Sequence, residues 1–188
     1  MSDAFHSVAA VAACLAVTPC FAGIIDTYSV GSGQFHSTVQ IDFSTGDGYV
    51  FNVAWSGTAT GMDLLQIIDQ AMSVNDPEAF QLVTDDFGWG AFVSGLGVGD
   101  SYEYGTGDLW PEVENYWHYW TDSGTAGGPG NDWQSSWIGA SDRIAYDGSR
   151  DGWVFILPDA PQSVPTPAAA VVALLFGGSL GSPRRRRR

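Results

Sequence analysis

The fold is decided by residues 36–55, which read HSTVQIDF-STGDG-YVFNVAW. In the first arm, the apolar residues Val39, Ile41 and Phe43 alternate with polar ones. In the second arm, Phe51, Val53 and Trp55 alternate with Val50, Asn52 and Ala54. Such alternation places one set of side chains on one face of a strand. Residues 44–48, with two glycines, are typical of a turn. The stretch therefore predicts a β-hairpin of strands 36–43 and 49–55.

The segment after the hairpin changes to helical periodicity. Thr60 offers an N-cap, and Asp63 follows three residues later, as in a capping box. Apolar residues then recur at the spacing of one helix face: Leu64, Leu65, Ile68, Ala71 and Met72. Pro77, after Asn75 and Asp76, ends the pattern. We therefore expect one amphipathic helix.

The rest of the chain is rich in strand patterns. Further strands are expected at residues 80–84, 91–96, 115–121, 133–138 and 153–157. A hairpin followed by one helix and more strands indicates an α+β fold, namely a β-grasp-like mixed sheet with one amphipathic helix. A small β-sandwich carrying one helix is the alternative.

Three short motifs support the β-grasp interpretation. They are GAFV at residues 90–93, the aromatic strand YWHYW at 116–120 and the closing segment IAYDGSRDGWVF at 144–155. Their order resembles the transcobalamin-like C-terminal β-grasp module over residues 38–155. The resemblance implies a ligand-binding domain with a corrinoid as ligand. The chain departs from the family pattern after the aromatic strand, where Thr121-Asp-Ser-Gly124 and a longer loop replace the usual Asn-Gly.

Three blocks follow one another at the C-terminus. Val164-Pro165-Thr166-Pro167 leads into an apolar run at residues 168–180, and five arginines end the chain: Arg184, Arg185, Arg186, Arg187 and Arg188. Prolines keep the approach extended, the apolar run partitions into lipid, and the arginines resist transfer across the bilayer. This run of thirteen residues is shorter than the ~20 that span a bilayer as a helix, which indicates a transient membrane association.

This order of blocks resembles the PEP-CTERM sorting signal of bacterial surface proteins, which an exosortase recognises and cuts. Thr166 stands where the family motif has glutamate. The resemblance implies that export machinery and an exosortase-like sorting enzyme are partners of the chain. It also implies an exported protein that ends at the cell envelope or in the extracellular matrix.

The N-terminus agrees with export. Residues 8–17 form an apolar run, and small residues precede a cleavage point after Ala22, which predicts a signal peptide at 1–22. The first seven residues lack Lys and Arg and carry Asp3 instead. Cleavage before Cys14, as in a lipoprotein, is the alternative, although few apolar residues precede it. A globular domain at 23–158, a proline-rich linker at 159–167 and the signal at 168–188 complete the predicted organisation.

Composition limits the function of the exported domain. Both cysteines, Cys14 and Cys20, lie in the signal peptide, so disulfides and thiolate chemistry are excluded from the domain. The stretch between the signal peptide and the arginine tail contains two arginines and twenty carboxylates, which gives it a net charge of −18. The chain has no lysine. Such a surface repels nucleic acid and anionic lipid.

Aromatic residues give the main functional hypothesis. Trp117 and Tyr119 share one face of the aromatic strand and are expected in the core, whereas Trp120 lies on the other face. There Trp120 and Trp133, with the acids Asp122 and Asp132, would form a shelf that stacks on sugar rings. In the alternative, the loop at 124–132 folds back and covers this second row.

Catalytic and metal motifs are weak in this sequence. Asp147 and Asp151 occupy positions 1 and 5 of a loop like an EF-hand, but Pro158 stands at position 12 where a bidentate glutamate is needed. His36 and His118 lie within strand patterns. We therefore expect no enzyme activity, no cofactor and no metal. The sequence favours a structural surface or matrix protein, and the alternative is a module that binds polysaccharide or a corrinoid through the aromatic shelf.

Overall fold

The computed structural model describes residues 23–86, 88, 90–106, 115–122, 132–156 and 159–162. The predicted signal peptide, the sorting motif, the apolar run with its arginine tail, and the loop at 123–131 lie outside these residues. The part of the chain that the structure describes contains no helix that could span a membrane.

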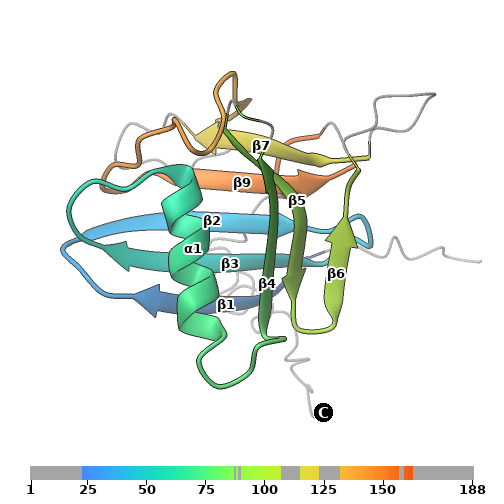
Figure 1. The fold of residues 1–188 in the computed structure, drawn as a ribbon, viewed down its shortest axis with the longest axis horizontal. Coiled ribbons are helices and arrows are strands. Elements are labelled where there is room, and N and C mark those ends of the chain that lie inside the picture. The colour runs from blue at the N-terminus through green and yellow to red at the C-terminus, as the bar shows by residue number, and fades with distance from the viewer. Residues whose placement is uncertain are drawn as a thin grey trace, which may run out of the picture.

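A six-stranded mixed sheet forms the main layer of the molecule (Figure 1). Its strands lie in the order β1-β3-β2-β9-β7-β8. They are β1 (Ile24–Gly31), β3 (Gly48–Trp55), β2 (Phe35–Asp42), β9 (Arg150–Phe155), β7 (Trp117–Asp122) and β8 (Trp133–Ser135). β1 runs parallel to β3 and β2 runs parallel to β9, while the other neighbours are antiparallel.

The four central strands have the predicted β-grasp order. The β2–β3 hairpin comes first, the helix follows, and β7 and β9 complete the set, with β2 and β9 parallel at the centre. This confirms the α+β mixed-sheet fold. The hairpin pairs Val39 with Phe51 and Ile41 with Tyr49, the register that the alternation requires.

Helix α1 (Gly61–Met72) and a second sheet cover one face of the large sheet (Figure 1). The second sheet is antiparallel, in the order β4 (Phe80–Asp86), β5 (Ala91–Val98) and β6 (Ser101–Tyr104). The core lies between these layers, and its completely buried side chains include Ile41, Phe51, Leu64, Leu65 and Ile68. The parallel pairing of β2 with β9 at the centre of the large sheet follows the β-grasp order, and the second sheet adds a layer that the sequence did not predict.

The start of α1 follows the predicted capping box. The Asp63 amide donates to Thr60 Oγ1 at 3.1 Å, and the Thr60 amide donates back to Asp63 Oδ2 at 2.7 Å. This arrangement satisfies amide groups that have no partner within the helix. Ala71, predicted on the apolar face, is exposed, whereas Met72, the last residue of the predicted stripe, packs against the core.

Candidate functional site

One row of the aromatic strand β7 belongs to the core, as the alternation predicts. Trp117 is buried between Phe43 and Phe155, whose ring centroids lie 5.4 Å and 5.0 Å from its own. Tyr119 stacks on Trp153 at a centroid distance of 4.6 Å. Offset and edge contacts of this kind are the favoured aromatic geometries. Trp117 and Tyr119 therefore hold β7 against β9 beneath the helix and the second sheet.

The other row lies on the back face, by which we mean the face of the large sheet that points away from α1. Trp120, Asp122 and Trp133 are brought together there, whereas Asp132 lies just before β8 and is exposed. Asp122 and Trp133 are 2 % and 9 % exposed. Arg150 Nη1 lies 3.2 Å from Asp122 Oδ2, and its guanidinium lies 4.6 Å from the centroid of the Trp133 ring. The predicted shelf residues thus meet, but Asp122 and Trp133 are covered and already have partners.

The part of this face around Gly152 is covered by the chain's own segment at residues 159–162, which we call the strap. Pro161 is buried over Gly152 on β9. A Cβ on Gly152 would collide with the Pro161 ring and would lie 3.2 Å from Trp133 Cζ3. A glycine inside a strand often marks the close approach of another segment. Part of the stretch predicted as a linker is therefore packed on the domain.

Two polar side chains of β2 fix the strap. The Gln162 amide donates to Asp42 Oδ2 at 2.6 Å, and Gln40 Nε2 donates to the Gln162 carbonyl oxygen at 2.9 Å. Gln40 and Asp42 are 0 % and 2 % exposed. Burial raises the pKa of the Asp42 carboxyl, and the hydrogen bonds from Gln162 and Gln40 oppose this rise. Sequence reasoning did not select Gln40 or Asp42, and Gly152 within an aromatic strand was the only signal that could have indicated the site.

A second buried polar cluster lies on the core side of β9. Asp151 is completely buried, accepts a hydrogen bond from the Tyr119 hydroxyl, and lies 3.2 Å from Arg143 Nη1 in an ion pair. Burial raises the pKa of Asp151, and Arg143 and Tyr119 counteract this in part. Burial, followed by the Asp151 charge, likewise raises the pKa of Tyr119. A Cβ on Gly61 would collide with the Tyr119 hydroxyl, so the first residue of α1 packs directly on this cluster.

The loop resembling an EF-hand is divided between two structural roles. Asp147 Oδ1 accepts a hydrogen bond of 2.8 Å from the His36 amide, which fastens the turn before β9 to the start of β2. Asp151 is engaged in the core by Arg143 and Tyr119. The two carboxylates therefore serve different contacts, in agreement with a turn stabilised by aspartate.

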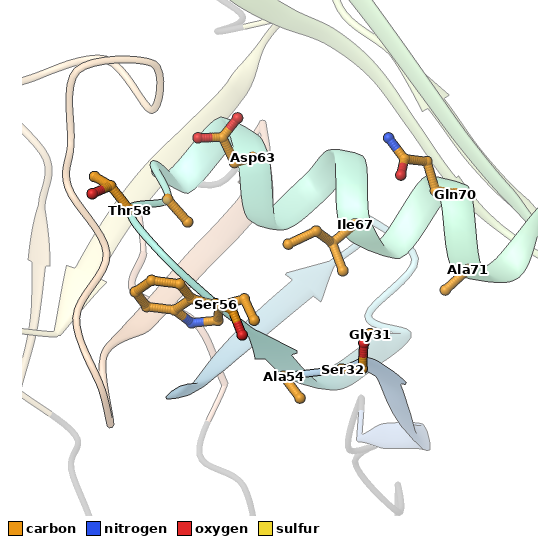
Figure 2. Close-up of a pocket in the computed structure, with 11 residues that line it drawn as sticks. Gly31, Ser32, Ala54, Ser56, Thr58, Asp63, Ile67, Gln70 and Ala71 are labelled. Carbon is orange, nitrogen blue, oxygen red and sulfur yellow. The ribbon is translucent and has the colours of Figure 1, made fainter. Parts of the chain in front are cut away.

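A hollow of about 530 Å³ opens beside α1 (Figure 2). Ile67 projects from the helix toward Ala54 on β3, and Ala71 continues the apolar side. The lining also includes hydroxyl, amide and carboxylate groups: Ser32, Ser56, Thr58, Gln70 and Asp63. Asp63 is the only charged residue in the lining and already accepts from Thr60. The lining therefore combines an apolar side with uncharged polar groups and one carboxylate.

Comparison of the chain with protein-family models, curated proteins and solved structures found no match. Within the described residues, no group of three or more His, Cys, Asp or Glu side chains converges as a metal site.

Proposed function

We propose that this chain is an exported cell-surface or extracellular-matrix protein, sorted by an exosortase-type system, with a structural and non-catalytic role. The observation that carries the proposal is the order of the three C-terminal blocks: the motif at Val164–Pro167, the apolar run and the arginine tail. Apolar and cationic blocks in this order stop a chain in transit through a membrane. Export machinery and the sorting enzyme are the partners that this proposal requires.

The folded domain supports a structural role. Its buried acids take part in internal contacts: Asp42 with the strap, Asp122 with Arg150, and Asp151 with Arg143. A carboxylate engaged in this way is held in place by the fold and is not presented to a substrate. The net charge of −18 between the two predicted signals suits a soluble surface in the extracellular matrix and disfavours binding to nucleic acid.

The test is carried out in the native host with the full chain. Replacing the five arginines at 184–188 by serine should abolish correct sorting, because the cationic stop is lost. Replacing them by lysine keeps the charge and is the matched control, which should sort like the parent chain. Intact-mass measurement of the surface or secreted form should show that the arginine tail has been removed. The proposal fails if the tail is still attached, or if the serine variant is sorted and processed normally.

A second candidate function is polysaccharide binding, and the pocket beside α1 is the observation that favours it. Its apolar side and its hydroxyl and amide groups match the two kinds of surface on a sugar. Ala71→Trp should fill the pocket and reduce retention on the host's exopolysaccharide. Gln66→Trp adds the same side chain at an exposed helix position outside the lining and is the control. Equal retention of both variants and the parent chain would exclude this site.

A further inference from the structure

Gln40 and Asp42 contact both backbone polar groups of a single residue. The carboxylate of Asp42 receives the Gln162 N–H, and the amide of Gln40 donates to the Gln162 C=O. Gln40 Nε2 also donates to both oxygens of Asp42, at 3.1 and 3.0 Å, which orients the carboxylate. The Gln162 side chain adds one bond, from Nε2 to the Gly46 carbonyl oxygen at 3.0 Å. The two buried side chains are thus arranged to bind a peptide backbone.

An apolar seat lies next to these polar groups. Gly152 pairs with Gln40 on β2 and with Trp120 on β7, so the seat is at the centre of the back face. The missing side chain at Gly152 leaves room for the ring of Pro161, which packs there beside Trp133. In a Pro-X segment, the proline ring therefore packs at Gly152, and the backbone N–H of the next residue binds Asp42.

We propose that Gln40, Asp42, Gly152 and Trp133 form a peptide-binding site for an extended Pro-X segment, and that its ligand is the strap of the same chain. The X residue cannot be proline, because its N–H must reach Asp42. Proline-containing segments suit such a site since their restricted backbone loses little entropy on binding. The site thus recognises the proline ring and the backbone N–H and C=O of the residue that follows it.

The strap lies next to the predicted sorting motif, so its binding would affect that motif if the proposed function is correct. Gln162 is six residues before Ala168, where the apolar run begins, so the connecting chain spans at most about 20 Å. A bound strap would hold the sorting motif close to the domain surface. The peptide-binding site itself does not depend on sorting, and it is tested on purified protein.

The first experiment measures binding in trans to the full chain. Gln162→Pro removes the donor to Asp42 and leaves the four site residues unchanged, so the strap should dissociate. A labelled synthetic peptide spanning residues 157–164 should then bind this variant at least ~10-fold more tightly than the parent chain, whose own strap competes. The same peptide with proline in place of Gln162 should not bind. Equal binding to variant and parent chain, or no binding to a folded variant, would overturn the proposal.

The second experiment keeps the proposal testable if Gln162→Pro does not fold. Hydrogen exchange at the Gln162 amide of the parent chain should be at least ~10-fold slower than in an unstructured peptide. Gly152→Ala should remove this protection by displacing Pro161. Gly139→Ala is the matched control, because a Cβ there meets nothing within 4 Å, and it should keep the protection. An unprotected Gln162 amide in the parent chain would show that the strap does not bind.

Discussion

Replacing Arg143 by methionine should strongly destabilise the protein. The substitution keeps an unbranched apolar side chain in place of the arginine stem and removes the charge that faces Asp151 at 3.2 Å. The two side chains are 7 % and 0 % exposed, so water cannot replace the lost partner. Removing one partner of a buried ion pair costs about 3–5 kcal/mol. This is a large part of the roughly 5–15 kcal/mol that stabilises a domain of this kind.

The loss should depend on pH in a direction fixed by the pKa of Asp151. Burial raises the pKa of this carboxyl above its unfolded value of about 4, and Arg143 counteracts part of the rise. A raised pKa in the folded state means that folding takes up a proton, so stability decreases as pH rises from about 4 through the folded pKa. Without Arg143 the folded pKa is higher still. The difference between variant and parent should therefore be smallest near pH 4 and largest at neutral pH.

Urea unfolding followed by tryptophan fluorescence at several pH values measures both effects. The double variant Arg143→Met/Asp151→Asn is the decisive comparison, because it removes the uncompensated charge and keeps an oxygen that can accept from Tyr119. It should recover more than half of the stability lost in Arg143→Met at neutral pH. If the single variant unfolds at the midpoint of the parent, or if the double variant is no more stable than the single one, the buried-charge reasoning is refuted.

Other predictions concern separate parts of the fold. Trp117→Ala should cost ~3–5 kcal/mol in urea unfolding, as expected for a buried aromatic residue, whereas Trp120→Ala should cost less because this residue is only partly buried. Thr60→Ala should lower stability by ~1 kcal/mol through loss of the capping box, and no loss would mean that water replaces the cap. Millimolar calcium should raise the melting temperature no more than magnesium does, since Asp147 binds the His36 amide and Asp151 lies in the core; a calcium-specific rise would contradict this assignment.

Much of the fold could be predicted because its central elements have strong periodicity. The hairpin at residues 36–55 alternates over both arms, and the helix after Thr60 carries an N-terminal cap as well as an apolar stripe. β1 and β6 were missed for a physical reason. β1 is an edge strand with exposed Ile25 and half-buried Tyr28, so its pattern is shaped by one neighbour only. β6 has four residues, too few for periodicity to appear.

The back face could not be predicted, because its key contacts join residues far apart in the chain. Gln40 and Asp42 occupy the polar positions of an alternating strand, a pattern typical of a face open to water. They are buried because a segment about 120 residues later crosses that face and supplies the backbone groups that they bind. Alternation reports which side chains share a face, and it does not report what covers the face.

The contacts of the strap also bear on the C-terminal boundary of the globular domain. A boundary at Pro158 follows from proline content, since several prolines in a short stretch usually indicate a linker. The contacts of Pro161 and Gln162 show that the packed domain extends at least to Gln162. If the chain ended at Pro158, the Asp42 carboxylate would lose the backbone donor that opposes the rise in its pKa, and Gly152 would face an empty seat. The strap is therefore part of the domain's structure, and the predicted sorting motif begins two residues after its last residue.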